Sequence, residues 1–341
     1  MLVSQPIALV THPDCDLHHT GPGHSESDGR IPALLEAVRG DADLATAVAE
    51  RRGTPVAEED LLRVHAPEHV ARVRAASEDA RERGDLVWLD PYTPVGPDSF
   101  AAALAAAGCA VAAAELVAGR EAPTAFALPR PPGHHANRDQ AMGFCLFNNV
   151  AVAARRLQAR GLAEKVLVLD WDAHHGNGTQ DIFYEDPTVF VLSAHIVSGY
   201  PSTGKASELG AGRGEGTNRN VPLPRGTGGP RYRRSVLSAL DGALAAFTPD
   251  FVLISAGFDC LSGDPEGGFL LEPEDLHLLT KDVLARFPGP GKVALVLEGG
   301  YALDRIGGGL VDVLRALGGL PPVVQAIVRP TRLKRATGPR S

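Results

Sequence analysis

The sequence predicts an α/β fold built on a parallel β-sheet. Short apolar runs recur along the chain with helical segments between them, which is typical of strands joined by crossover helices. The runs are almost continuously apolar rather than alternating, as expected of strands that are buried on both faces of a sheet. With 341 residues, 44% of them hydrophobic, the chain is long enough to bury a large core around such a sheet.

The expected strands and helices alternate along the chain. The strands are expected at 6–10 (PIALV), 124–128 (TAFAL), 165–170 (KVLVLD), 188–193 (TVFVLS), 250–255 (DFVLIS) and 292–298 (KVALVLE). The helices are expected in amphipathic or alanine-rich segments at about 99–118, 146–160, 231–246, 273–286 and 303–317. The longest uncharged stretch, 99–114, has 16 residues and is mostly alanine; this is short for a membrane span and predicts a buried helix.

Two segments lack this periodicity and are expected to be loops. Segment 11–30 is rich in Pro, Gly, His and Asp, and segment 196–230 contains STGKASELGAGRGEGTNRN. A loop as long as the second is often the wall or lid of a site. Its glycines do not follow a strand and open a helix, so they do not make a dinucleotide-binding fingerprint. No repeat or linker divides the chain, which predicts one domain over 1–328 and a basic tail over 329–341.

Charge and cysteine content narrow the functional classes. A net charge of −8 and a pI near 5.8 argue against a general nucleic-acid-binding protein, whose surface would be basic. The four cysteines lack the spacing of a zinc knuckle or a disulfide-bonded scaffold, and no basic segment precedes the short N-terminal apolar run. We therefore expect a cytoplasmic protein with no nucleic-acid or membrane partner. The sequence leaves the oligomeric state open, a homo-oligomer included.

Polar clusters stand at the carboxyl ends of several expected strands. They are PRPPGHH after 124–128, DWDAHHGNG after 165–170, AGFDCLSGDP after 250–255 and EGGY after 292–298. In open α/β sheets, ligands bind beyond the carboxyl ends of the strands. We therefore expect these clusters to converge on one site.

Three of these polar residues point to a metal. Asp170, Asp172 and His174 are spaced by two, so that in extended backbone their side chains point to the same side. Two carboxylates and an imidazole are costly to bury together unless a cation neutralises them. Asp259, after another strand, can supply a third ligand and leave the open coordination position that a catalytic zinc site needs. The alternative is that these aspartates form turns, since DP and GD pairs are common in loops.

The adjacent histidines His134 and His135 suit proton transfer better than metal binding, because neighbouring side chains do not easily reach one ion. Tyr301 follows two glycines, which let its hydroxyl approach a ligand closely, although an ordinary core tyrosine is the alternative. We expect a structural role for the lone histidines His12, His65, His69 and His277. The loop histidines that stay unassigned are His18, His19 and His24.

A series of motifs then extends over 129–301: RPPGHH, MGFCLFNN, LDWDAHHGNGTQDIFY, SAGFDCLSGDP and LEGGY. These motifs, preceded by LLRVHAPEHVARV at 61–73, resemble the successive signatures of the histone deacetylase and acetylpolyamine amidohydrolase family. DWDAHHGNGTQ is more similar to the class II and bacterial members than to class I. The resemblance implies the arginase/deacetylase-like three-layer α/β fold with a central, mostly parallel sheet of about eight strands.

The resemblance also implies the roles of individual residues. The ligands of Zn²⁺ would be Asp172, His174 and Asp259. Fe²⁺ is the alternative metal, because an oxygen-rich ligand set does not decide between the two. The catalytic residues would be His134, His135 and Tyr301, with His135 as the proton shuttle.

Further positions of the family pattern would support these residues. Asp170 would lie behind His134 and, with Ser193, hold a structural K⁺. Asn177 stands behind His135, where class I enzymes have an aspartate. An uncharged partner stabilises the imidazolium less, so we expect a lower pKa for His135 than a carboxylate would give.

The substrate tunnel is the part in which the sequence departs from most relatives. Phe144 and Tyr200 match the aromatic tunnel walls, and Glu266 matches the tunnel mouth, where most relatives have leucine or methionine. The polyamine-selective class IIb deacetylase of vertebrates also has glutamate there. The first loop reads GHSESDGRI, in which Glu26 and Arg30 match the family but its two prolines are missing.

We therefore expect a zinc-dependent amidohydrolase that removes acetyl groups from acetylpolyamines or from acetyl-lysine side chains and releases acetate. One alternative is a catalytically silent acyl-amine-binding protein that kept the fold and the metal. Another is a related metal hydrolase acting on a guanidino or thioester substrate; an arginase relative would need a two-metal ligand set.

Overall fold

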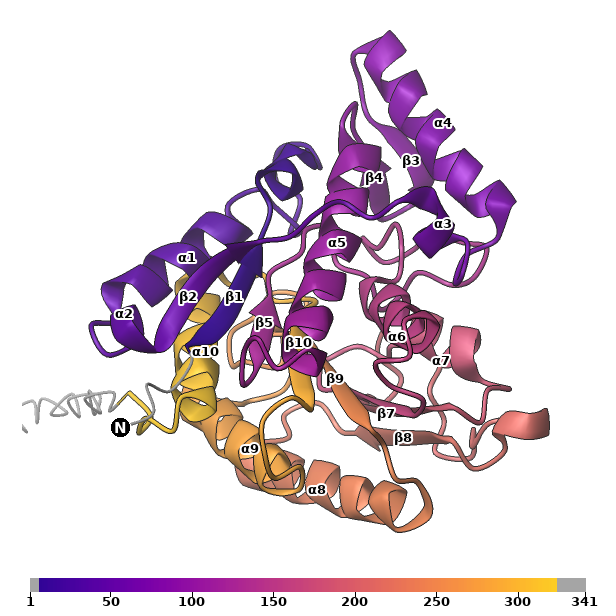
Figure 1. Cartoon of the computed structure of the whole chain (residues 1–341). Coiled ribbons are helices and arrows are strands. Elements are labelled where there is room, and N and C mark those ends of the chain that lie inside the picture. The colour runs from indigo at the N-terminus through magenta and orange to yellow at the C-terminus, as the bar shows by residue number, and fades with distance from the viewer. Residues whose placement is uncertain (1–5, 324–341) are drawn as a thin grey trace, which may run out of the picture.

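The computed structural model describes residues 6–323, which form a central sheet with helices on both faces (Figure 1). The sheet has eight strands in the order β2-β1-β5-β10-β9-β6-β7-β8, and all neighbouring strands are parallel. Its strands are β1 (Ile7–Thr11), β2 (Val48–Arg52), β5 (Ala125–Ala127), β6 (Val166–Asp170), β7 (Val189–Ile196), β8 (Asn218–Leu223), β9 (Phe251–Ala256) and β10 (Val293–Leu297). The expected parallel sheet of about eight strands is confirmed.

Helices cover both faces because side chains along each central strand alternate between two apolar clusters. In β6, Leu167 and Leu169 belong to the cluster under α1, α8, α9 and α10, whereas Val166 and Val168 belong to the cluster under α4, α5 and α6. The helices are α1 (Arg30–Gly40), α2 (Leu44–Ala47), α3 (Glu58–Leu61), α4 (Pro67–Arg83), α5 (Ser99–Ala118), α6 (Asn149–Ala159), α7 (Asn177–Phe183), α8 (Gly229–Ala246), α9 (Pro273–Ala285) and α10 (Leu303–Leu317).

Helix α5 is the one helix within residues 6–323 that is long and apolar enough to cross a membrane, by length and composition. It lies in the core and packs against α6 and the strands β1, β5 and β10. A Cβ at Gly108 of this helix would lie 2.1 Å from the carbonyl oxygen of Thr54, so small residues let the neighbouring backbone approach. The expected buried helix is thus confirmed.

The expectation of one loop over 196–230 is wrong in part. Strand β8 lies inside this segment, and α8 begins at its end. β8 is an edge strand that contains Pro222, and edge strands tolerate proline because one side of the backbone needs no ladder partner. The other edge strand, β2, has the polar sequence VAERR. Continuous apolar runs identify central strands, and they miss both edges because edge strands are partly solvent-exposed.

Segment 11–30 remains mostly loop, with one short 3₁₀ helix at Pro13–Leu17. After it, α4 leads into a separate antiparallel hairpin of β3 (Val87–Asp90) and β4 (Thr93–Val95), which was not among the expected strands. Helix α6 begins with Asn148 as N-cap. The predicted basic tail over 329–341 lies outside the described residues.

Candidate active site

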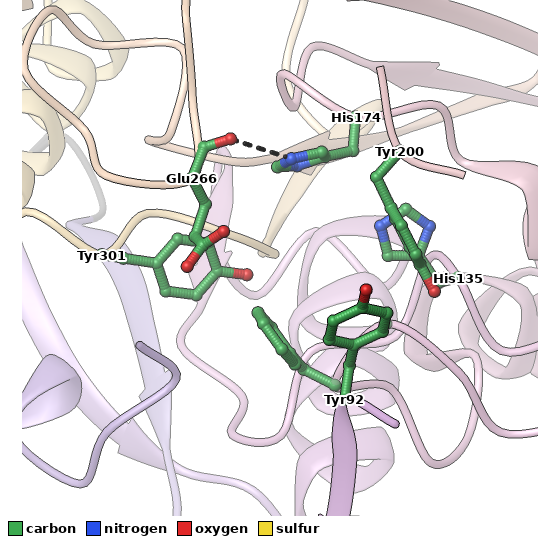
Figure 2. Close-up of a pocket in the computed structure, with 8 residues that line it drawn as sticks. Tyr92, His135, His174, Tyr200, Glu266 and Tyr301 are labelled. Atoms are coloured by element: carbon green, nitrogen blue, oxygen red, sulfur yellow. Dashed lines mark hydrogen bonds between the residues drawn. The ribbon is translucent and has the colours of Figure 1, made fainter. Parts of the chain in front are cut away.

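The polar clusters meet at the carboxyl edge of the sheet's centre. The strands that precede them, β5, β10, β9 and β6, are consecutive in the sheet. A cavity of about 230 Å³ opens there, and Figure 2 shows aromatic and imidazole rings around it. Its lining residues are Tyr92, His135, Gly143, Phe144, His174, Tyr200, Glu266 and Tyr301. The predicted convergence of the strand ends is confirmed.

Asp172, His174 and Asp259 form a compact cluster beside this cavity. Each offers one ligand atom, and these atoms lie within 4.8 Å of one another. The Nδ1 atom of His174 is 3.1 Å from Asp172 Oδ1 and 3.0 Å from Asp259 Oδ2. The other ring nitrogen, Nε2, donates to the carbonyl oxygen of Glu266 at 3.1 Å (Figure 2). This second hydrogen bond leaves Nδ1 as the nitrogen that can bind a metal.

Backbone groups hold the two carboxylates of the cluster in place. The N–H of Ala173 donates to Asp259 Oδ1 at 2.7 Å, and the N–H of Gly299 donates to Asp172 Oδ2 at 2.8 Å. A Cβ at position 299 would lie 2.2 Å from Asp259 Oδ2. Glycine is therefore required there for the close approach of the backbone to both carboxylates.

The charges of the cluster call for a cation. Burial and the charge of Asp172 raise the pKa of Asp259 to about 7. Burial also opposes ionisation of Asp172, but the charges of His134 and His174 outweigh it and lower the pKa of this carboxyl. Two buried carboxylates therefore compete for the positive charge that is available. Two carboxylate oxygens and one imidazole nitrogen form a donor set that zinc and iron(II) both accept.

Asp170 is separated from this cluster because β6 ends at this residue and the chain then turns. Its Oδ2 lies 2.9 Å from His134 Nδ1, and its Oδ1 accepts the N–H of Asp172 at 3.0 Å. It thus lies behind His134, as the resemblance implies. Ser193 stands opposite Asp170 in the register of β6 and β7, and its hydroxyl is 2.9 Å from His195 Nδ1.

The two adjacent histidines have different partners. His134 faces the Asp170 carboxylate, whereas the Nδ1 of His135 lies 2.7 Å from Asn177 Oδ1. Burial lowers the pKa of His134, but the charges of Asp172 and Asp170 outweigh it and raise this pKa to about 10. Burial and the charge of His134 hold the pKa of His135 well below its ordinary value. The environment thus favours a neutral His135 beside a charged His134.

Glu298, at the end of β10, holds the loop that carries both histidines. Its Oε2 accepts the N–H groups of Gly133 at 2.7 Å and His134 at 3.0 Å, and its Oε1 accepts the hydroxyl of Ser255 at 2.9 Å. Burial raises the pKa of this carboxyl to about 7. Sequence reasoning missed Glu298, although an acidic residue directly after a buried strand is a signal that could have found it.

Tyr301 is held by its backbone and by two contacts to its ring. Its N–H donates to Asp264 Oδ2 at 2.6 Å, and the ring meets Phe144 edge-on at 5.6 Å between centroids. The guanidinium carbon of Arg30 lies 4.9 Å from the ring centroid, and Arg30 is itself paired with the buried Glu26 at 3.0 Å. Burial raises the pKa of Tyr301 well above its ordinary value, so the hydroxyl keeps its proton and can donate it.

The aromatic walls come from loops that are far apart in the sequence. Tyr200 and Phe144 both line the cavity, as the resemblance implies. Tyr92, between β3 and β4, was not singled out by any motif, yet it lines the cavity and meets Tyr200 edge-on at 5.9 Å. Gly143 has a φ of +55°, and a Cβ there would lie 2.6 Å from the ring of His135. A side chain at position 143 would therefore displace the rings of His135 and Tyr200, which line the cavity.

The first loop closes the side of the cavity where the family prolines are missing. Ser25 donates its hydroxyl to Glu266 Oε1 at 2.5 Å. The ring of His24 packs on Phe144 at 4.8 Å, and its Nε2 donates to the carbonyl oxygen of Tyr92 at 3.2 Å. These side-chain contacts therefore fix the first loop at the edge of the cavity.

The histidines expected to be structural lie away from the cavity lining and bond to backbone groups; these are His12, His65, His69 and His277. The loop histidine His18 is also buried, 2.7 Å from the hydroxyl of Ser99.

Fold and site together place the protein among α/β proteins whose functional site, here with three residues able to hold a metal, lies at the carboxyl edge of a parallel sheet. The model of the histone deacetylase domain matches residues 24–317, and the chain belongs to this family. The family is generally metal-dependent, and its deacetylases and amidohydrolases support a hydrolase activity on amides for this chain.

Several relatives cover most of the chain. The histone deacetylase-like amidohydrolase of Pseudomonas aeruginosa is 38% identical over 287 residues, which is 82% of this chain and 73% of that protein. The probable deacetylase of Archaeoglobus fulgidus is 36% identical over 299 residues, 87% of this chain and 81% of that protein. Among solved structures, the crystal structure of the HDA15 HD domain matches with a TM-score of 0.86 and 34% identity, over 95% of this chain and 91% of that chain.

Proposed function

We propose that this protein is a zinc-dependent amidohydrolase that releases acetate from small acetylated amines, with acetylpolyamines preferred over acetyl-lysine peptides. The observation that supports the reaction is the placement of the Asp172, His174 and Asp259 cluster, His135 and Tyr301 around one cavity. The observation that supports the substrate class is the carboxylate of Glu266 in the lining of the same cavity.

The residues would divide the reaction as follows. Asp172, His174 Nδ1 and Asp259 would hold the metal, which when bound polarises the acetyl carbonyl and lowers the pKa of a water molecule. His135 takes a proton from the attacking water and later gives it to the departing amine. Tyr301 donates a hydrogen bond to the oxygen that becomes negative, which stabilises the transition state.

Two residues beside the metal site, Asp170 and Ser193, would help to hold a second ion. We extend the proposal to a structural K⁺ near Asp170 and Ser193, which are register partners in the adjacent strands β6 and β7. Burial outweighs the charge of His134 and raises the pKa of Asp170, so a nearby cation would keep this carboxylate ionised. Replacing KCl by tetramethylammonium chloride should lower the melting temperature, and an unchanged melting temperature would contradict the ion.

Glu266 supports the choice of substrate through its contacts. Its backbone oxygen is fixed by His174 and its carboxylate by Ser25, so the side chain is held at the cavity. A carboxylate there can pair with the distant ammonium group of an acetylpolyamine, whereas an acetyl-lysine peptide presents a neutral backbone. The pair should be worth roughly 1 kcal/mol if it stays solvated.

The test compares kcat/KM for acetylputrescine, acetylspermidine, an acetyl-lysine peptide and longer acyl-lysines. The wild type should prefer the acetylated polyamines, and Glu266→Leu should shift the preference toward the peptide. Glu59→Leu is the matched control, because it removes an exposed carboxylate outside the cavity lining and should keep the wild-type order of substrates. A wild-type preference for peptides that Glu266→Leu leaves unchanged would contradict the substrate proposal. Absence of acetate release from every substrate would favour the silent binding protein.

A further inference from the structure

The orientation of the Asn177 side chain decides which nitrogen of His135 carries the proton. Asn177 turns its Oδ1 toward His135 Nδ1 at 2.7 Å, so Nδ1 holds the proton and Nε2 is free to accept one. If the amide were reversed, its NH₂ group would face Nδ1, and the proton of the neutral ring would move to Nε2. A His135 in that form could not take a proton from water. An aspartate at position 177 would not have this difficulty, because either of its carboxylate oxygens can accept the hydrogen bond from His135 Nδ1.

Asn137 opposes the reversed orientation. Its Oδ1 accepts a hydrogen bond from Asn177 Nδ2 at 3.1 Å. The same Nδ2 lies 3.4 Å from the carbonyl oxygen of His135 and 3.3 Å from the sulfur of Met142. A reversed Asn177 would place its oxygen beside the carbonyl oxygen of His135 and the sulfur of Met142, which cannot donate, and it would lose the bond to Asn137 Oδ1, the shortest of the three contacts. The cost of that arrangement favours the observed orientation.

Asn137 is in turn anchored on both sides of its backbone. Its N–H donates to the carbonyl oxygen of Gln140 at 2.9 Å, and its carbonyl oxygen accepts from His65 Nδ1 at 2.9 Å. The other nitrogen of His65 accepts the N–H of Asn148 at 2.9 Å, so only Nδ1 of this ring can donate. Burial lowers the pKa of His65 to about 3, which keeps the ring neutral. The structural role expected of His65 thus extends to the support of Asn137.

We propose that Asn137 is a positioning residue, whose side-chain oxygen orients the Asn177 amide so that His135 presents an unprotonated Nε2 to the attacking water. The proton then passes from the water to Nε2 and from Nε2 to the nitrogen of the departing amine, and Nδ1 keeps its own proton throughout. This inference rests on the role of His135 in the proposed function.

The first test compares two substitutions of Asn137, one that removes the accepting side-chain oxygen and one that keeps it. Asn137→Leu keeps the size of the side chain but removes the acceptor, and kcat should fall roughly fivefold to tenfold, the change that one ordinary hydrogen bond sustains. KM and hydroxamate affinity should not change. Asn137→Asp keeps an accepting oxygen and should restore most of the rate. Gln140→Ala, in an exposed position of the same turn, is the matched control and should behave like the wild type.

The second test repeats Asn137→Leu in the Asn177→Asp background. A carboxylate needs no orientation, so the additional change should have little effect on kcat there. An equal loss in both backgrounds would overturn the proposal, because the effect would then come from the turn rather than through Asn177. No loss in the wild-type background would overturn it as well.

The third test does not depend on turnover. NMR of the imidazole nitrogens, with His135 assigned by its loss in His135→Phe, should show the proton on Nδ1 in the wild type and a mixture of both forms in Asn137→Leu. A wild-type His135 protonated on Nε2 would overturn the inference whatever the activity. The expected form in a protein without deacetylase activity would support the inference and contradict only the proposed function.

Discussion

Tyr301→Phe is the substitution whose effect follows most directly from the geometry of the site. It removes one hydroxyl, and no hydrogen bond among residues 6–323 uses this hydroxyl. The groups that hold the residue are its backbone N–H, bound to Asp264, and its ring, packed against Arg30 and Phe144. Phenylalanine keeps all of these contacts, so the fold and the cluster of Asp172, His174 and Asp259 should be unaffected.

The expected loss is therefore confined to the transition state. Removing one hydrogen-bond donor to a developing oxyanion typically costs about 3–4 kcal/mol, and each ~1.4 kcal/mol is about a tenfold change in rate. We expect kcat for acetate release to fall roughly a hundredfold to a thousandfold, with little change in KM.

Three measurements separate this outcome from damage to the fold: acetate release, the Kd of a hydroxamate and the melting temperature. Hydroxamate affinity should stay within about tenfold of the wild type, since only one hydrogen bond to the ligand is lost. A variant that keeps most of its turnover, or that loses turnover and hydroxamate affinity in equal proportion, would refute the role of the hydroxyl.

Three further predictions address the histidines and the cavity wall. His135→Ala should be nearly inactive while His134→Ala keeps more residual rate, because His135 faces the cavity and His134 faces Asp170. Single-turnover rates of the two variants measure this, and rates in the reverse order would exchange the roles of the two histidines. Gly143→Ala should lower kcat/KM at least about tenfold, since its Cβ would lie 2.6 Å from the His135 ring, and a wild-type rate would contradict the close packing. For His65, the pKa is lowered from 6.5 to about 3, so below about pH 6.5 the unfolded chain binds more protons and stability falls as pH falls. Urea titrations at about pH 5.5 and about pH 7.5 give the increase in unfolding free energy between these two pH values. This increase should be about 1.4 kcal/mol smaller in His65→Leu than in the wild type. An equal increase in both proteins would contradict a neutral His65 ring in the folded protein.

The central part of the fold could be predicted from sequence because its residues are buried on both faces. Strands such as β6 and β9 consist of uninterrupted apolar residues, and the polar clusters that follow them were expected to meet. The edge strands β2 and β8 could not be found in this way, because their side chains are partly exposed and the sequence is polar. The hairpin that supplies Tyr92 contains the short apolar run LVWL (86–89), which was not among the expected strands, and it forms a separate two-stranded sheet.

In the candidate site, the residues next to one another in sequence were predictable and the long-range contacts were not. The spacing of Asp170, Asp172 and His174 predicted a metal site, but the turn that separates Asp170 from the other two could not be predicted. The contact of Ser25 with Glu266 joins residues 241 positions apart, and no local pattern records it. The bond between Asn137 and Asn177 depends likewise on how two loops meet.

The central claim is that the Asp172, His174 and Asp259 cluster holds a metal on which turnover depends. The direct test is to strip the purified protein with a chelator, to measure acetate release from acetylputrescine and an acetyl-lysine peptide, and to titrate Zn²⁺ or Fe²⁺ back. Activity should disappear with the metal and return when about one ion per chain is bound, as expected of a catalytic site with protein ligands and one open position. His174→Ala should bind no ion at this site and stay inactive after titration. Full activity in the metal-free protein would contradict the account.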